Sequence, residues 1–511
     1  MSPLDRRSQD TVRSVVIVGG GVTGWLAAAT LAAALGNGVA ITVVDSDDGE
    51  IGEGFARIET APPGFGRMNA AFGFGEDELI GSARGAFSLG VRHCGWSGSG
   101  TAYFQPFGEI GGALGSVGFH NFLLRLERPE TLEAYSLAAL AAKAGRFARP
   151  SRDPRSVLST LDYGLHLDMR PYVQRLSDHA RRLGVRRSEG RVAEKVSADG
   201  GAIAAVRLEA GAELSADLFL DCSGSAAVLI GEAPGARWQD WGRHLPFDRM
   251  VDTVVEEPAA PAPFNETSAD ETGWLRRTPT QGATGLAYVY GSRFLDDATA
   301  DGRLRRLAGA SPDAEPRRSI LRSGRRASFW RANCIALGAA AASLGPLESA
   351  NLRIVQSGLS RLIALFPHRT DNAAAAAEYD RLMASEIERV RDLVALHALL
   401  NRRTGEALWD ACRAAETPDS LAYKLDLFES RARFAPIDEE PFPPSVWTSV
   451  LLGQGVRPRR YDRLADAIDK AGLETTLAQM GEAMAQAVRT MPSHADVLRA
   501  CCAGYPLEAA G

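Results

Sequence analysis

Two periodicities of apolar residues alternate along this chain of 511 residues, and they predict its elements. Residues 15–18 are all β-branched and apolar, as in a buried strand. A glycine-rich turn follows, and the alanine-rich run over 25–35 predicts a helix. A second apolar strand is expected over 40–44. This order of strand, turn, helix and strand predicts a βαβ unit and therefore an α/β fold.

The regular pattern returns in the middle of the chain. The expected elements are a helix over 166–183 and strands over 192–195, 202–208 and 217–220. His166 would then lie at the helix start. The last strand ends at Asp221, and a turn of small residues up to Gly224 follows it. Such a turn can close beside the nucleotide site that the first βαβ unit predicts.

The rest of the chain predicts a second sheet and then helices. Trp274–Phe294 alternates as strands do, and a proline-rich connection precedes it over 255–263. A strand over 333–337 leads into small residues from Gly338 onward. Two helical stripes follow, formed by Leu352, Val355, Leu359, Leu362 and Phe366, and by Tyr379, Met383, Ile387, Val390 and Val394.

The first turn carries the residues expected to hold a dinucleotide. Gly19, Gly21 and Gly24 have the G-x-G-x-x-G spacing, which lets backbone N–H groups and a helix N-terminus approach a pyrophosphate. Asp45 ends the second strand, at the distance expected of a ribose-binding acid. Because the chain returns to this sheet near Asp221 and again near Gly338, the pattern favours FAD over NAD.

These patterns predict three parts of the chain. They are a discontinuous FAD-binding domain over 11–235 and 326–367, substrate-side insertions over 86–150 and 236–325, and a mostly helical C-terminal domain over 368–511. The second sheet is expected to cover the active site.

Charge and cysteine content narrow the class of protein. The net charge of −6 does not indicate a nucleic-acid partner, and no apolar run reaches the roughly eighteen residues of a membrane span. The six cysteines show no metal-binding or redox spacing, so no metal site is expected. We expect reduced thiols and a cytoplasmic protein.

Several motifs together resemble the flavin-dependent halogenases typified by tryptophan halogenases. They are the glycine turn, DLFLDCSG at 217–224, YVYGSRF at 288–294, FWRANCIALGAAA at 329–341, PLES at 346–349, LLGQGVRPRRY at 451–461 and MPSH at 491–494. The resemblance implies a flavoprotein-monooxygenase fold and non-covalent FAD, reduced by a separate flavin reductase. It also implies oxidation of halide to hypohalous acid, which a lysine passes to an aromatic ring.

The chain departs from that family at several positions. The segment that carries the family's lysine aligns with residues 86–93, and Ser88 stands in the place of the lysine. A serine hydroxyl cannot supply an ammonium group. The family's W-x-W-x-I-P aligns with residues 274–279, where Trp274 is kept and Arg276 replaces the second tryptophan. Arg276, Arg277 and Arg57 would suit a substrate with a carboxylate.

Four further residues are candidates for the site. Glu348 matches the family's glutamate and is expected to act as a base or to polarise the electrophile; alternatively it complements the following helix. Ser349 is expected to cap that helix and to direct it at the flavin. His93 would line the substrate pocket or simply pack in the core. Trp447 would stack on a substrate or belong to the core.

Three functions remain open on the sequence. The first is an oxygenase that hydroxylates an electron-rich aromatic molecule or peptide, which requires an open path from the flavin on the Ser88 side. The second is a halogenase in which Ser88 or an arginine guides the hypohalous acid. The third is a degenerate FAD-binding protein or an oxidase. The oligomeric state is open, a homodimer included.

Overall fold

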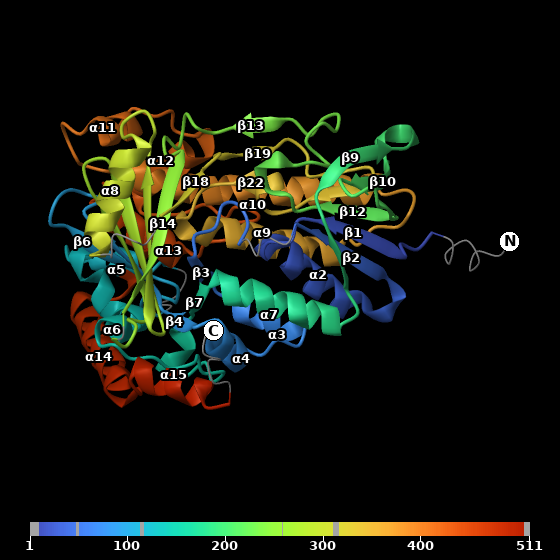
Figure 1. Cartoon of the computed structure of the whole chain (residues 1–511). Helices are drawn as coiled ribbons and strands as arrows, with labels where there is room; N and C mark the ends of the chain where they lie inside the picture. The colour runs from blue at the N-terminus through green and yellow to red at the C-terminus, as the bar shows by residue number, and fades with distance from the viewer. Residues whose placement is uncertain (1–9, 47–50, 113–116, 258, 310–315, 505–511) are drawn as a thin grey trace.

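The computed structural model describes residues 10–46, 51–112, 117–257, 259–309 and 316–504. Two larger sheets lie at opposite ends of the molecule, with helices α9 and α10 between them (Figure 1). The helices are α2 Val22–Leu35, α3 Phe65–Ala71, α4 Glu76–Ser82, α5 His120–Arg125, α6 Leu137–Lys143, α7 Met169–Arg182, α8 Asp297–Ala308, α9 Ala350–Ala364, α10 Ala373–Leu399, α11 Ala407–Arg413, α12 Asp419–Arg431, α13 Pro444–Gly453, α14 Lys470–Thr490 and α15 His494–Cys502.

The first sheet is the nucleotide-binding sheet that the sequence predicts. Its order is β20-β21-β12-β1-β2-β8, and its strands are β1 Ser14–Val18, β2 Ala40–Asp45, β8 Arg186–Glu189, β12 Leu218–Asp221, β20 Trp330–Arg331 and β21 Cys334–Ala336. All pairings are parallel except that of β20 with β21. Helices α2 and α7 pack together beside it, and the apolar residues of β1 are buried.

The second sheet takes strands from two distant parts of the chain. Its order is β18-β14-β17-β16-β15-β5-β6, and its strands are β5 Gly90–Cys94, β6 Ala102–Pro106, β14 Arg249–Glu256, β15 Asn265–Ala269, β16 Gly273–Thr280, β17 Ala283–Tyr290 and β18 Arg317–Ile320. The predicted second sheet is therefore present, and β5 and β15 join its two parts in parallel.

Three small sheets complete the fold. They are formed by β9 Val192–Ser197, β10 Ile203–Leu208 and β11 Glu213–Ser215; by β3 Ile58–Ala61, β4 Ala86–Ser88 and β7 Gly164–Asp168; and by β13 Trp238–Asp240, β19 Gly324–Arg326 and β22 Ala342–Ser343. The C-terminal part is mostly helical, as predicted, and both predicted apolar stripes are buried except at Phe366, which follows the end of α9. No helix among the described residues is long and apolar enough to cross a membrane.

One predicted boundary is wrong. The helix expected from residue 166 begins at Met169, because Asp168 caps it by accepting a hydrogen bond from the Arg170 backbone N–H at 3.2 Å. His166 instead lies within β7 and is fully buried. The alternation of Leu165, His166 and Leu167 has the period of a strand, and pairing with β3 and β4 decides the outcome.

Candidate functional site

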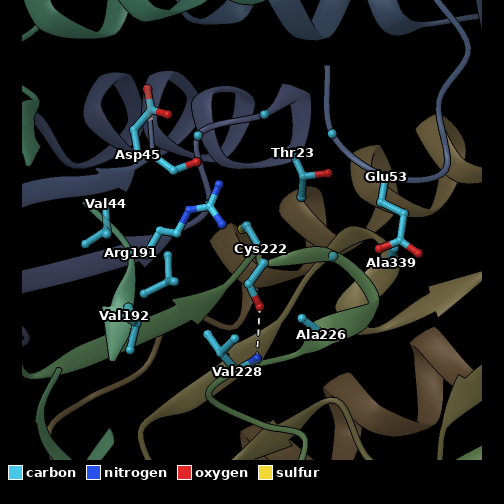
Figure 2. Close-up of a pocket in the computed structure, with 18 of the residues that line it drawn as sticks. Thr23, Val44, Asp45, Glu53, Arg191, Val192, Cys222, Ala226, Val228 and Ala339 are labelled. Atoms are coloured by element: carbon cyan, nitrogen blue, oxygen red, sulfur yellow. Dashed lines mark hydrogen bonds between the residues drawn. The ribbon is translucent and has the colours of Figure 1, made fainter. Parts of the chain in front are cut away.

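A cavity of about 580 Å³ opens where the carboxyl ends of β1, β2 and β12 meet the start of α2 (Figure 2). Its walls include Gly19, Gly21, Asp45, Glu53, Arg191, Gly224 and Ala339. Ligands of α/β sheets bind at this edge, where helix N-termini and free backbone N–H groups favour phosphate. The volume is in the range of small-molecule and cofactor sites.

The glycines shape this cavity because side chains would not fit. A Cβ on Gly24 would lie 1.8 Å from the carbonyl oxygen of Gly19, and a Cβ on Gly20 would lie 2.1 Å from Oδ1 of Asp45. Gly19 itself has a φ of 120°. The turn is therefore held tightly against α2 and β2, which leaves its outer backbone face for a pyrophosphate. This cradle fits a dinucleotide cofactor.

Two of the predicted cofactor residues shape the cavity from behind. Asp221 is fully buried, and its carboxylate accepts hydrogen bonds from Ser223 and from the backbone N–H groups of Leu229 and Ile230. Asp221 does not line the cavity, so the predicted contact with the cofactor is wrong. Its carboxylate instead supports the turn after β12. Gly338 packs against Thr23, whose side chain does line the cavity.

Glu53 and Arg191 were missed by sequence reasoning, although both line the cavity (Figure 2). Glu53 accepts a hydrogen bond from the Ser225 backbone N–H at 2.8 Å and so joins two walls. Asp45 accepts one from Nε of Arg187 at 3.0 Å, which fixes the orientation of its carboxylate at the cavity wall. These contacts join segments that are far apart in sequence, so no local sequence pattern predicts them.

Glu348 lies in a second, buried site. It is 9% exposed and precedes α9 in a loop where Glu348 and Ser349 have φ values of 59° and 53°. Two successive residues in the left-handed region cost about 1–3 kcal/mol each, and such strain is typical of functional sites. The predicted cap is wrong, because the Ser349 side chain makes no capping hydrogen bond to α9.

Both oxygens of Glu348 accept hydrogen bonds. Nε2 of His397 lies 2.8 Å from Oε1, and Nε2 of Gln105 donates to Oε2 at 2.7 Å. Gln105 also contacts Nε2 of His93 at 3.0 Å, and Tyr103 contacts Nδ1 of His397 at 3.1 Å. All of these side chains are buried, so a hydrogen-bonded polar network surrounds Glu348.

Burial and charge decide the protonation of this network. Burial, together with nearby His397, lowers the pKa of His93 well below its usual value, so its imidazole is neutral at pH 7. Burial raises the pKa of Tyr103 well above its usual value, so Tyr103 keeps its proton. His93, Glu348 and His397 lie close enough to share a metal ion, but every imidazole nitrogen already has a hydrogen-bond partner.

The cavity beside Glu348 has a volume of only about 10 Å³, room for one water molecule. His93, Arg276, Glu348 and Ser349 are among its lining residues. Nε of Arg276 is buried without a hydrogen-bond partner among the described residues. Arg276, whose Nε–H has no partner there, and Glu348 therefore line the same small space.

Arg276 also closes the region between this cavity and β3. Its guanidinium makes a bidentate ion pair with Glu59, at 2.8 and 2.9 Å, and donates to the carbonyl oxygens of Ile58 and Pro346. Its side chain is 3% exposed and that of Glu59 is 4% exposed. The open path on the Ser88 side that hydroxylation requires stays a prediction.

Ser88 lies away from the cavity beside Glu348, whereas Trp447 lies in the core, which is one of the two places predicted for it. Ser88 is fully buried in β4, and its hydroxyl donates to the carbonyl oxygen of Gly90 at 3.3 Å. It does not line the cavity beside Glu348. Trp447 is 2% exposed, and Nζ of Lys424 lies 3.4 Å from the centre of its ring. Lys424 thus covers one face that a substrate ring would use.

Trp274 belongs to an aromatic cluster beside the network. It is 2% exposed and lies 5.7 Å from Trp96, ring centre to ring centre. Trp96 in turn lies 5.5 Å from His397 and 5.5 Å from Trp409. The walls around Glu348 are therefore closely packed.

Gln105 and His397 were not predicted, although a weak signal exists for each. His397 continues the apolar stripe of α10 past Val394, and Gln105 interrupts an otherwise apolar strand. A polar residue at a core position needs a hydrogen-bond partner. The sequence cannot identify that partner, because Glu348 is distant along the chain from both.

The comparisons with known proteins agree with this geometry. The tryptophan halogenase family matches residues 14–470. The chain is 36% identical to BrvH, a flavin-dependent halogenase from Brevundimonas sp. BAL3, with a TM-score of 0.89 over 96% of this chain and 99% of that one. For Xcc4156, a flavin-dependent halogenase from Xanthomonas campestris, the identity is 33% and the TM-score 0.90, over 98% and 100%.

A curated relative, the tryptophan 6-halogenase SttH of Streptomyces toxytricini, is 26% identical over 94% of this chain and 96% of its own length. The cofactor of such enzymes is FAD, reduced by a separate flavin reductase, and the glycine cradle described above fits it. With its FAD-type cavity and the buried glutamate of its PLES segment, this enzyme belongs to the flavin-dependent tryptophan halogenase family.

Proposed function

We propose that this enzyme oxidises halide and passes a small oxidant to the cavity beside Glu348, without a lysine carrier. The observation that carries the proposal is the position of Arg276, which bridges β16, β3 and the loop before Glu348. The closed walls favour a carrier of water size over direct contact between an aromatic substrate and the flavin. The relatives named above are halogenases, which supports the same choice.

Reduced FAD, when bound, supplies the electrons with which O₂ converts a halide ion to hypohalous acid and water. Nε of Arg276 would donate a hydrogen bond to the oxygen of that acid, which makes the oxygen a better leaving group. Glu348 would take the proton that an aromatic ring loses as the carbon–halogen bond forms and the oxygen–halogen bond breaks, and that proton would then pass to the departing hydroxide, which leaves as water. An aromatic ring reaches Glu348 only after the cavity walls rearrange.

A second candidate is hydroxylation of an electron-rich aromatic molecule or peptide. The serine at position 88 favours it, because no ammonium group is available there to carry a halogen. Direct oxygenation would require Arg276 to leave Glu59. We further propose a transient complex with a flavin reductase. A reducing, cytoplasmic setting is also proposed, in keeping with six cysteines that are all free.

One single-turnover experiment separates these functions. The FAD-bound enzyme is reduced without oxygen and mixed with ¹⁸O₂, phenol as a probe ring, and either bromide or no halide. We expect bromophenol, and faster return of oxidised FAD with bromide. Phenol that gains ¹⁸O without bromide would replace the proposal with hydroxylation. Hydrogen peroxide as the sole product would overturn both.

Two isosteric variants test the roles in the same assay. Glu348→Gln removes the base and is expected to lower the bromophenol yield at least tenfold. Thr278→Val is the matched control, because the buried hydroxyl of Thr278 has no hydrogen-bond partner among the described residues and lies on the same strand as Arg276. Equal losses in both variants would exclude Glu348 as the base.

A further inference from the structure

Two chains of buried hydrogen bonds end on the two oxygens of Glu348. One arrives through Gln105 at 2.7 Å and the other through His397 at 2.8 Å. A carboxylate can only accept hydrogen bonds, so an ionised Glu348 requires a donor from each chain. This requirement fixes the direction of every bond behind it.

The first chain runs from Trp96 through Thr267, His93 and Gln105. Since the Gln105 amide nitrogen faces Glu348, its carbonyl oxygen faces His93 and must accept from Nε2–H at 3.0 Å. Nδ1 of His93 then carries no proton and accepts a hydrogen bond from the Thr267 hydroxyl at 2.8 Å. The chain ends at Trp96, whose indole N–H can only donate and does so to the Thr267 hydroxyl oxygen at 2.9 Å.

The second chain runs from Gln454 through Tyr103 and His397. Nε2–H of His397 donates to Glu348, so its Nδ1 accepts from the Tyr103 hydroxyl at 3.1 Å. The amide nitrogen of Gln454 donates to the Tyr103 oxygen at 3.2 Å. In this pattern of hydrogen bonds each histidine donates from Nε2 and accepts at Nδ1.

We propose that these chains hold Glu348 as an oriented anion, and that the histidine tautomers and the charge of Glu348 depend on each other. Gln105, His93, Thr267 and His397 are positioning residues in this account. Their role as supports of a base rests on the proposed function, but the coupling of tautomer to charge does not. A protonated Glu348 would donate to one chain and reverse the direction of its bonds.

The chains orient the carboxylate and do not carry its proton to solvent. Their outer ends, Trp96 and Gln454, are 0% and 1% exposed. The titratable and charged groups around Glu348 are His397 from α10, His93 from β5, Tyr103 from β6, Arg353 from α9, and Arg276 from β16 with its partner Glu59. The proton that Glu348 takes up must therefore leave through the small cavity.

Nitrogen-15 NMR of the FAD-bound protein with labelled histidine tests the coupling without any turnover. We expect His93 and His397 as neutral Nε2–H tautomers at pH 7, assigned with His93→Gln and His397→Gln variants. In Glu348→Gln the new amide presents a donor to one chain, so one of the two histidines should change to the Nδ1–H form. Thr278→Val should leave both unchanged.

An Nδ1–H or doubly protonated form of either histidine in the wild type would overturn the proposal. Unchanged tautomers in Glu348→Gln would overturn it equally. If bromination is observed, Tyr103→Phe and Thr267→Val should lower kcat roughly three- to tenfold and move the acid limb of the pH profile upward, with KM for bromide unchanged. Absence of bromination refutes the proposed function alone, because the NMR result still decides the coupling.

Discussion

Replacement of Arg276 by methionine tests whether the buried ion pair with Glu59 closes the site. The change removes two hydrogen bonds to Glu59 and those to the carbonyl oxygens of Ile58 and Pro346. Both side chains are less than 5% exposed, so the Glu59 carboxylate would remain buried without its counter-charge. Loss of one partner from such a pair costs about 3–5 kcal/mol.

Urea unfolding of the FAD-bound protein, followed by tryptophan fluorescence, measures this cost. We expect the Arg276→Met variant to lose about 3–5 kcal/mol. The double variant with Glu59→Gln should recover about 2 kcal/mol of that loss, because the buried charge is gone. The amide oxygen introduced by Glu59→Gln can still accept the hydrogen bond from the Ala56 backbone N–H, which Glu59 accepts at 2.6 Å.

Arg381→Met provides the control, because the Arg381–Glu378 pair is exposed, at 56% and 45%. We expect a change below about 1 kcal/mol for it. A loss below about 1 kcal/mol for Arg276→Met as well, or no recovery in the double variant, would refute the closure of the site by this pair.

The remaining predictions concern the cofactor turn, the missing lysine and pH. Gly24→Ala should abolish FAD binding in a titration, because its Cβ would lie 1.8 Å from the Gly19 oxygen; near-normal affinity would contradict the tight turn. Ser88→Lys should unfold at lower urea and should not raise the bromophenol yield, since position 88 is fully buried. Burial lowers the pKa of His494, which contacts the Pro261 carbonyl oxygen, from 6.5 to about 4. The unfolded chain therefore binds more protons between these values, and stability falls as the pH drops from 6.5 to 4, by about 3 kcal/mol in all. His494→Gln should flatten that slope, and an unchanged slope would exclude His494 as its source.

Local patterns determined the nucleotide-binding half of this protein. The apolar run of β1, the glycine spacing and the acid at the end of β2 follow one another within a few tens of residues. Each is fixed by backbone geometry, so the sequence specifies the turn, the helix and the cradle directly. The two apolar stripes of α9 and α10 were predictable for the same reason.

The second site was decided by the tertiary structure. Glu348 and its helix were visible in the sequence, but its partners Gln105 and His397 come from β6 and α10, and Arg276 finds Glu59 on β3. Likewise Ser88 could be aligned with a lysine, yet packing of β4 turns its hydroxyl to Gly90. Hydrogen bonds between distant segments depend on how the sheets and helices pack. The periodicity of apolar residues along the sequence does not specify that packing.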